Sequence, residues 1–402
     1  MRVFSSICCC LFFSFITVSL ARAIPEWTFH GKVAEGGQFD ALAGPDGKVH
    51  LISSAYYQFD VDGRRLLIEN EGDEKQSGMS FPPSLAVDSL GNVHMITRHG
   101  GSNAGSGFDI RYRKRTAAGE WLDDFVVGSR QARNYVVGIA APGMDSVYMH
   151  ATKAGDNVWG DIRIWKKNGI SADTIGDLGG IWRADTDARM RGFDGKIFLV
   201  SGKCDGNGAA YFTFCNVGAN CFNELSENIE AHSSGNYRKG APDLYVDKKG
   251  NVHMTYGTRF EVYYNQYNSE QEAVFSKDRK LFSGLGSWHL QLGLSAIAAT
   301  DDGDVVVAVA LDPDGSKGGG NSELIWVYST DSGASWSVPE RLGVYTDAGE
   351  GRRRPRLVAV EDTFMLFFQD NAVGGISLAT IELNHTSGIP SIMAPVHHLL
   401  LK

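Results

Sequence analysis

The stretch FDALAGPDGKVHLI, residues 39–52, sets the pattern for the whole chain. It consists of an apolar segment, a turn rich in Asp and Gly, and a second apolar segment. Copies of this pattern recur at residues 83–96 (PSLAVDSLGNVHMI), 137–150, 188–200, 241–255 (APDLYVDKKGNVHMT), 294–307 and 355–367. Equivalent positions lie roughly 44 to 59 residues apart, a period typical of single blades rather than whole domains. We therefore predict an all-β, seven-bladed β-propeller. The equivalent positions are His50, His94, Tyr148, Phe198, His253, Val306 and Met365.

The strands of each copy are expected to form antiparallel sheets. The apolar runs are short, rich in Val, Ile, Tyr and Phe, and separated by Gly and Asp turns. A further strand follows the copies, as at residues 109–112 and 161–164, so four strands per blade fit the repeat length. Residues 27–33 precede the first copy and are expected to pair with the last blade, which would close the ring. Residues 24–402 then form a single propeller domain.

The first 23 residues predict export. An apolar run from Val3 to Leu20 ends in Ala21-Arg22-Ala23, which is typical of a signal peptide and its cleavage site. No later segment approaches the roughly 20 apolar residues of a membrane-spanning helix. We expect a secreted, extracellular and monomeric protein without a membrane partner. The sequon at residues 384–386 fits a glycoprotein.

Three cysteines remain after the leader: Cys204, Cys215 and Cys221. In an oxidising compartment they allow one disulfide and leave one thiol over. Zinc is the alternative, but it needs a fourth ligand and the spacing matches no common zinc pattern.

Net charge and its distribution indicate the class of ligand. The formal charge of −9 argues against a nucleic-acid partner. Positive charge is nevertheless concentrated just before two first strands, at residues 238–239 and in the run Arg352-Arg353-Arg354 followed by Arg356. The hairpin turns of a propeller share one face, so these segments belong to the other face. That face is predicted to hold a central funnel rich in Arg, His, Tyr and Trp, side chains that bind carboxylates, transfer protons and stack on sugars. An acidic polysaccharide or oligosaccharide is the expected ligand.

Two motifs resemble known secreted propellers. Residues 329–336 form an S-x-D-x-G-x-x-W sequence that resembles the Asp box of sialidases and related propellers, where it is a structural turn. The F/Y-R-I-P arginine motif of sialidases is absent. A blade of the seven-bladed propeller polysaccharide lyases is instead resembled by residues 81–83 (FPP), 88–94 (DSLGNVH), His99 and 110–112 (IRY). A second stretch, from Tyr237 through His253 to Arg259, resembles the same pattern.

The resemblance implies a lyase that breaks the bond to O4 of a uronic acid by β-elimination. It is slightly closer to L-rhamnose-α-1,4-D-glucuronate lyases, which act on arabinogalactan of the gum arabic type, than to ulvan lyases. Arg163 or Arg259 would neutralise the uronate carboxylate, His99 would be the base, and Tyr148 or Tyr237 the acid. His94 is a second candidate for either proton transfer. The remaining residues expected to bind substrate are Arg98, His150 and Arg354.

Other interpretations of the same residues stay open. His50, His94 and His253 occupy one repeated position, which also fits packing, and Arg163 could be an exposed strand residue. A glycoside hydrolase, rhamnosidase-like or sialidase-like, would need two carboxylates, and few acids stand on the predicted funnel loops. A sugar-binding propeller without activity would need no proton donor. The elimination scheme requires no metal or other cofactor, although a structural calcium ion is compatible with the fold.

Overall fold

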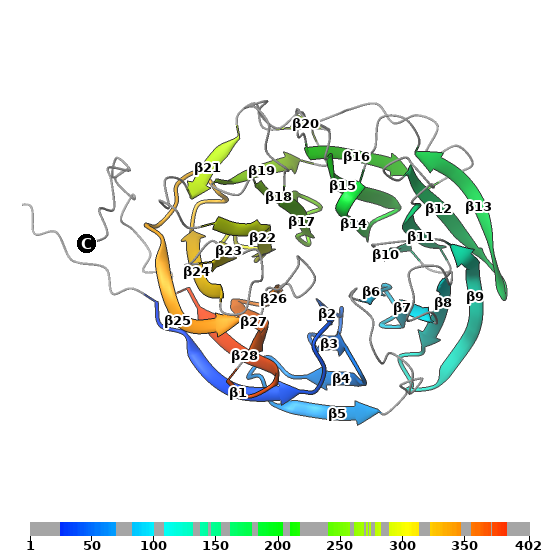
Figure 1. Ribbon diagram of the computed structural model, residues 1–402, viewed down its shortest axis with the longest axis horizontal. Coiled ribbons are helices and arrows are strands. Elements are labelled where there is room, and N and C mark those ends of the chain that lie inside the picture. Colours follow the sequence, from blue (N-terminus) through cyan, green and yellow to red (C-terminus); the bar gives the residue numbers. More distant parts are fainter. Residues whose placement is uncertain are drawn as a thin grey trace, which may run out of the picture.

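The computed structural model describes residues 25–69, 83–99, 108–131, 137–143, 146–153, 161–178, 184–203, 210–217, 240–257, 261–268, 271, 273–274, 278–282, 289–312, 322–346, 355–370 and 372–383. These residues form strands and turns arranged in a ring around a central axis (Figure 1). Among them there is no helix with the length and apolar character needed to cross a membrane.

Three sheets contain four antiparallel strands each. The first sheet holds β2 (Asp40–Ala43), β3 (Val49–Ile52), β4 (Tyr56–Phe59) and β5 (Arg65–Glu69). The second holds β6 (Ser84–Val87), β7 (Val93–His99), β8 (Phe108–Arg115) and β9 (Trp121–Gln131). The third holds β10 (Val137–Gly143), β11 (Ser146–Lys153), β12 (Asp161–Asn168) and β13 (Ser171–Leu178).

The other strands form a three-stranded, a five-stranded and an eight-stranded sheet. The three-stranded sheet holds β14 (Ala184–Phe193), β15 (Lys196–Lys203) and β16 (Ala210–Asn216). The five-stranded sheet holds β17 (Gly240–Val246), β18 (Val252–Gly257), β19 (Val262–Asn268), β20 (Ala273–Val274) and β21 (Arg279–Phe282). The eight-stranded sheet holds β22 (His289–Ala299), β23 (Val305–Asp312), β24 (Ser322–Ser329), β25 (Glu340–Thr346), β26 (Arg356–Val360), β27 (Thr363–Asp370), β28 (Gly375–Glu382) and β1 (Thr28–Ala34).

An all-β propeller with four-stranded antiparallel blades is therefore confirmed, but the prediction of seven blades is not confirmed in the described residues. Hydrogen bonding groups the described strands into six sheets. The eight-stranded sheet joins β22–β25 to β26–β28 and β1 through one register pair, Thr346 with Asp370. The physical reason is that β25 approaches β27 closely enough to share a backbone pair, so hydrogen bonds cross from one repeat to the next.

The ring closes as predicted, because the N-terminal strand pairs with the last repeat. β1 lies antiparallel to β28, with Thr28 opposite Thr380 and Ala34 opposite Ile376. Just before β1, the Trp27 ring meets Trp326 edge to face at 5.3 Å between centroids. Pairing of β1 covers the outer edge of β28, which would otherwise present unpaired backbone groups.

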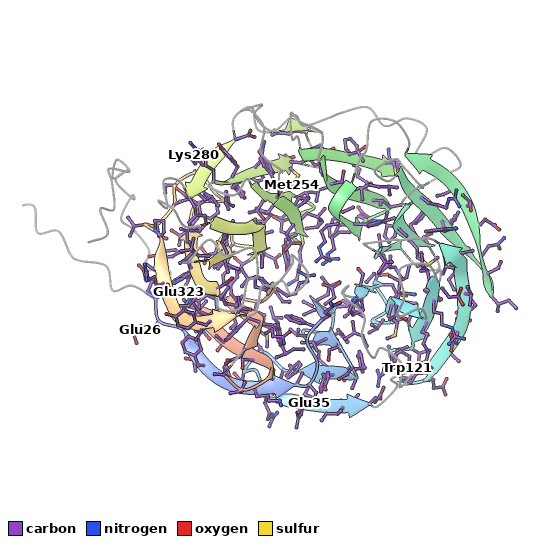
Figure 2. The ribbon with its side chains drawn as sticks, viewed as in Figure 1. Glu26, Glu35, Trp121, Met254, Lys280 and Glu323 are labelled. Carbon is purple, nitrogen blue, oxygen red and sulfur yellow. The ribbon has the colours of Figure 1, made fainter. Side chains whose placement is uncertain are left out.

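Apolar side chains fill the space between neighbouring sheets, as Figure 2 shows. Between the second and third sheets, for example, Ile110 and Tyr112 pack with Ile139 and Met149, all of them buried. The Asp box is a structural turn: Asp331 accepts a hydrogen bond from the Ser335 amide at 2.7 Å, and the Trp336 ring packs edge-on against Tyr264 at 4.9 Å. The turn is thus anchored to an adjoining sheet.

Cys215, on β16, is disulfide-bonded. This agrees with a bridge among the cysteines of this repeat and argues against zinc, since Cys215 is not a free thiolate. Cys204 and Cys221 lie outside the described residues.

We expect ring closure to depend on Trp27 more than on its exposed neighbour Phe29. Replacing a fully buried Trp by Ala costs roughly 3–5 kcal/mol, so for the half-buried Trp27 we expect Trp27→Ala to cost about 2 kcal/mol of unfolding free energy. Phe29 is 47% exposed, and Phe29→Ala should change stability by no more than about 0.5 kcal/mol. Urea unfolding followed by circular dichroism measures both; equal effects would contradict the role given to Trp27.

Candidate functional site

One position on the innermost strand is equivalent in all seven repeats. In each repeat it pairs with the residue two places after the repeated position that His50 represents in the first repeat; Asp40, for example, lies opposite Ile52. These positions form what we call the axial ring: Asp40, Ser84, Gly138, Arg189, Asp243, Ala296 and Arg356. Four of the seven are charged and buried, which is unusual for residues that line the centre of a fold.

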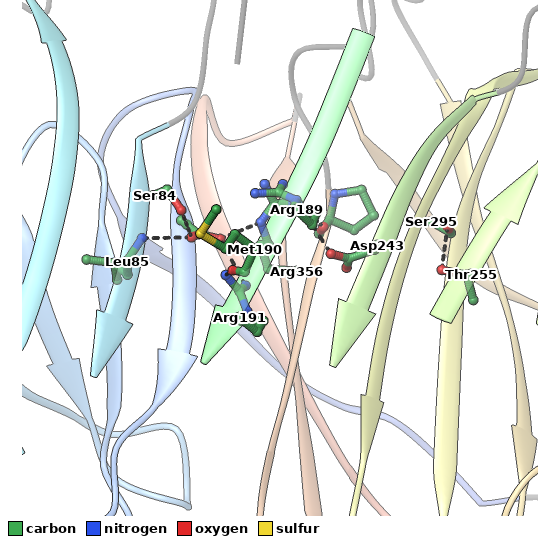
Figure 3. A network of polar contacts seen from close by, with 11 residues as sticks. Ser84, Leu85, Arg189, Met190, Arg191, Asp243, Thr255, Ser295 and Arg356 are labelled. Carbon is green, nitrogen blue, oxygen red and sulfur yellow. Dashed lines mark hydrogen bonds and ion pairs between the residues drawn. The ribbon is translucent and has the colours of Figure 1, made fainter. Parts of the chain in front are cut away.

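Asp40 links three repeats through one carboxylate. The Arg356 Nε donates to Asp40 Oδ1 at 2.8 Å, and the Leu85 amide donates to Oδ2 at 3.0 Å (Figure 3). Ser84 Oγ adds a longer bond to Oδ2 at 3.4 Å, and Arg191 Nη2 lies 4.0 Å from Oδ1. The Asp40 carboxylate is therefore well satisfied although it is fully buried.

Arg189 and Asp243 form a looser pair on the other side of the ring. Arg189 Nε lies 3.5 Å from Asp243 Oδ1, an ion-pair distance that does not make a hydrogen bond. Arg189 Nε and Nη2 and Asp243 Oδ1 have no hydrogen-bond partner among the described residues. Burial raises the pKa of Asp243 to about 6, against the opposing effect of Arg189 and Arg191. The pair thus keeps unused hydrogen-bonding capacity.

His150 fills the gap that Gly138 leaves in the ring. The two residues are directly opposite in the β10–β11 register, and a Cβ atom at Gly138 would lie 2.1 Å from His150 Nε2. His150 is fully buried, and neither ring nitrogen has a hydrogen-bond partner among the described residues. Burial and the nearby Arg189 lower the pKa of His150 to about 3, so its imidazole is neutral at physiological pH.

Among the residues that the structure describes at the axis, the charges do not balance. Three arginines, Arg189, Arg191 and Arg356, face two carboxylates, Asp40 and Asp243, which leaves one positive charge in excess within this described set when all are ionised. Each of the five is at most 8% exposed. Arg191 Nε and Arg356 Nη2 also have no hydrogen-bond partner among the described residues. An unpaired buried charge is costly, so the cluster is suited to a carboxylate or sulfate that brings acceptors and a negative charge.

A cavity of about 820 Å³ opens near the axis on the side of the hairpin turns, which we call the turn side. Its walls come from hairpins of six repeats and include Arg191, Tyr245, Ala86 and Ala141. Arg191 therefore connects this cavity to the axial ring. The opposite side, from which loops run into the first strands, is called the loop side.

The predicted residues lie at different levels of the propeller. His99 ends β7 and pairs with Asp109, three residues beyond Ile96 at ring level, which places its backbone about 10 Å toward the loop side. Arg98 precedes it; the side chains of both lie outside what the structure describes. Arg163, half-buried on β12, lies opposite Ala151 and so belongs to a third strand rather than to the innermost one.

Two other predicted residues lie toward the turn side of the ring. Tyr148 is fully buried in an apolar cluster with Ile164 and Met190. His94 has its Nδ1 2.7 Å from the Tyr112 hydroxyl and its Nε2 3.1 Å from Asp88 Oδ2, so both ring nitrogens have hydrogen-bond partners within the hairpin and the adjoining strand. The structure therefore separates His94 and Tyr148 from His99, whereas it places His150 beside Arg189. Tyr237, Arg259 and Arg354 lie outside the described residues.

Most residues of the axial ring are not among the site residues predicted from sequence. Arg189 and Arg191 lie within a strand that its apolar neighbours mark as core, and Asp40 and Asp243 precede their turns by a constant number of residues. That constant spacing was the available signal. No group of three His, Cys, Asp or Glu side chains in the described part of the chain is arranged to hold a metal ion, and the structural calcium ion stays a prediction.

Solved structures of other propellers are similar to this architecture. The propeller is similar to that of an ulvan lyase. That structure is described as a new family of polysaccharide lyase, PL25, and is bound to -[GlcA(1-4)Rha3S]-. It matches with a TM-score of 0.52 and 13% sequence identity, and the match covers 87% of this chain and 95% of the other. A second structure of a PL25 ulvan lyase gives the same values. At this identity the likeness shows the fold alone, a β-propeller. No protein-family model and no curated protein sequence matches the chain.

We expect anion binding at the axis to strengthen as the pH falls through about 6. Protonation of Asp243 removes the negative charge that competes for Arg189, while His150, whose pKa is about 3, stays neutral. Isothermal titration with sulfate between pH 5 and 8 measures this dependence. Asp243→Asn should bind about tenfold more tightly at pH 7.5, a gain of about 1.4 kcal/mol, and lose the pH dependence.

The matched control is Asp301→Asn, which changes an exposed carboxylate in another hairpin. An affinity that stays constant with pH in the unmodified protein would contradict the role given to Asp243.

Proposed function

We propose that the protein is a secreted polysaccharide lyase that acts on an acidic polysaccharide, built on a propeller of seven blade units. The observation that carries the proposal is the buried excess of positive charge at the axis, formed by Arg189, Arg191 and Arg356. A uronate-containing sugar would supply the missing negative charge. The likeness of the fold to an ulvan lyase supports the same class of reaction.

β-Elimination needs three roles at the scissile linkage. A cation holds the uronate carboxylate and so acidifies the C5 proton, a base removes that proton, and an acid protonates O4 as the C4–O4 bond breaks. The C5–H electron pair becomes the new C4–C5 double bond. We assign the base to His99, the cation to Arg163 or Arg259, and the acid to Tyr237. His94 and Tyr148 are better suited to packing, because both are buried on the turn side of the axial ring.

The axial ring would form the floor beneath these groups. Arg189 and Arg191 would attract an anionic group of the sugar, and His150 would present a neutral imidazole beside them. Arg98 and Arg354 are proposed to hold the sugar nearer the loop side. Such an arrangement uses several arginines because planar guanidinium groups bind carboxylates with two parallel hydrogen bonds.

The proposed reaction is the release of L-rhamnose from rhamnosyl-α-1,4-glucuronate ends of arabinogalactan. The resemblance of residues 81–112 to the rhamnose-glucuronate lyases supports this choice, and ulvan is the second candidate substrate. A hydrolase is favoured by one observation, the raised pKa of Asp243, since an acid with such a pKa could protonate a leaving group. Against it, Asp40 is held by Arg356 at 2.8 Å and cannot readily serve as the second carboxylate.

Ultraviolet absorbance during incubation with gum arabic, with ulvan in parallel, tests the proposal. A rising signal from the C4–C5 double bond together with free rhamnose is expected with gum arabic. His99→Ala should lower kcat by about 10²-fold or more, as loss of a general base does, while substrate is still bound. His30→Ala on the exposed outer strand β1 is the control and should leave kcat unchanged. Free sugar without the ultraviolet signal would indicate hydrolysis, and binding without any product would indicate a lectin.

A further inference from the structure

The residues opposite His50 and its equivalents form a second level at the axis. They lie two residues along each innermost strand from the axial ring, toward the turn side. Six of the seven are apolar or aromatic, and the seventh is an arginine. In chain order they are Leu42, Ala86, Ala140, Arg191, Tyr245, Ala298 and Val358. A buried arginine is rare in such surroundings unless an anion pairs with it.

Arg191 has a weaker hold on a carboxylate than the other two axial arginines. The Arg189 and Arg356 guanidinium groups each have a carboxylate oxygen within 3.5 Å. Arg191 Nη2 lies 4.0 Å from Asp40, which Arg356 already holds. Among the described residues, Arg191 Nη1 donates to the Met190 carbonyl at 3.2 Å and Nε has no partner, although the residue is only 8% exposed. The excess positive charge at the axis therefore belongs to Arg191 more than to the other two.

Arg191 is also the axial charge that lines the turn-side cavity of about 820 Å³. Leu42, Ala86 and Tyr245 of the same level line it too, together with Ile139. The Tyr245 hydroxyl donates to the carbonyl of another lining residue, Ala359, at 3.3 Å, which joins the walls of two repeats. A cavity of this size with apolar walls and one buried charged group is typical of a small-molecule site.

Carboxylates at the rim of the cavity restrict the charge of its ligand. The charged residues of the lining hairpin turns are Asp46, Asp88, Asp194, Asp247, Lys248 and Glu361. Asp46, Asp88 and Asp247 each have a Lys or His nitrogen within 3.3 Å. Asp194 and Glu361 are exposed, where salt screens a charge beyond about 10 Å. One ligand carboxylate at Arg191 is compatible with this rim, whereas a second carboxylate near the rim would be repelled.

We propose that the turn-side cavity binds a small monocarboxylic acid with an apolar body. The carboxylate accepts hydrogen bonds from Arg191, and the apolar body contacts walls such as Leu42 and Ala86. Arg189 keeps its unused donors, Nε and Nη2, for the sugar at the axial ring. The cavity lies on the turn side, away from the loop side that carries His99. It is therefore a second binding site that does not depend on the proposed lyase activity.

Isothermal titration with 2-naphthoate tests the proposal, with 2-naphthalenemethanol, acetate and naphthalene-2,6-dicarboxylate as comparison compounds. The naphthoate should bind at least about tenfold more tightly than each of the others. The alcohol lacks the charge, acetate lacks the apolar body, and the dicarboxylate places a second charge at the rim. Equal affinity for the naphthoate and the alcohol would overturn the proposal, as would absence of naphthoate binding.

Two variants locate the bound naphthoate. Arg191→Met should weaken naphthoate binding at least about tenfold and leave binding of the alcohol unchanged. Leu42→Trp, which enlarges a wall residue of the cavity, should weaken binding of both compounds by a similar factor. The matched controls are Arg64→Met, whose side chain is 77% exposed, and Leu90→Trp, at a residue that is 57% exposed. Both positions lie outside the cavity lining, and both proteins should bind as the unmodified protein does.

Polysaccharide cleavage should be unchanged in the Leu42→Trp and Leu90→Trp proteins, so failure of the lyase proposal and failure of this one are distinguishable. Circular dichroism verifies that each variant is folded, and the comparison compounds and Leu42→Trp decide the question without Arg191→Met. Naphthoate affinity that is unchanged by Leu42→Trp would overturn the proposal, because the ligand would then be bound elsewhere.

Discussion

The buried contact between Arg356 and Asp40 is the interaction on which the rest of the structure depends. It joins residues 316 positions apart in sequence and holds the last repeat against the first at the axis. A buried ion pair stabilises a fold only when its remaining hydrogen-bonding groups are satisfied. The Asp40 carboxylate meets this condition through the Leu85 amide of the next repeat, so one carboxylate fixes the relative positions of three repeats. On the Arg356 side, Nη2 has no hydrogen-bond partner among the described residues. At the outer edge, β1 closes the same ring by pairing with β28.

The repeat allows the residues at the axis to differ while the fold stays the same. Every repeat places one residue at an equivalent position, and the surrounding sheets fix the backbone there while the residue type varies. At Gly138 the side chain is lost altogether, and His150 from the neighbouring strand occupies the space. At the turn side, Gly44 stands where two other hairpins have an aspartate, Asp88 or Asp247, and His50 Nε2 has no hydrogen-bond partner among the described residues. In both places a glycine in one repeat removes a side chain, and the neighbouring histidine then has surroundings that differ from those in the other repeats.

Much of the fold could be predicted because its signals are local. Alternating apolar residues, Asp and Gly turns and the spacing of the copies indicate antiparallel blades, and the position of residues 27–33 outside the first copy indicates closure by β1. The repeated position of His50, His94 and His253 also indicates packing, although the sequence left a role in proton transfer open for His94. The joining of two repeats through Thr346 and Asp370 has no sequence signal, because a single backbone pair depends on how two sheets approach each other.

The candidate site was harder to predict, because buried charges are identified by their partners rather than by their own pattern. Arg189 becomes notable only when Asp243 from the next repeat and His150 from the preceding one are placed beside it. Tyr148 shows the reverse case: the sequence suggests a role in proton transfer, while in the structure its side chain is part of a buried apolar cluster.

The central claim is that the axial ring receives an anionic group of the sugar. The most direct test compares the affinity of a uronate-containing oligosaccharide with that of its carboxyl-reduced counterpart, for the unmodified protein and for Arg189→Met. The account predicts that carboxyl reduction weakens binding to the unmodified protein at least tenfold, about 1.4 kcal/mol, and has little effect on binding to the variant. An equal loss in both proteins would show that the carboxylate is recognised away from Arg189 and would contradict the account.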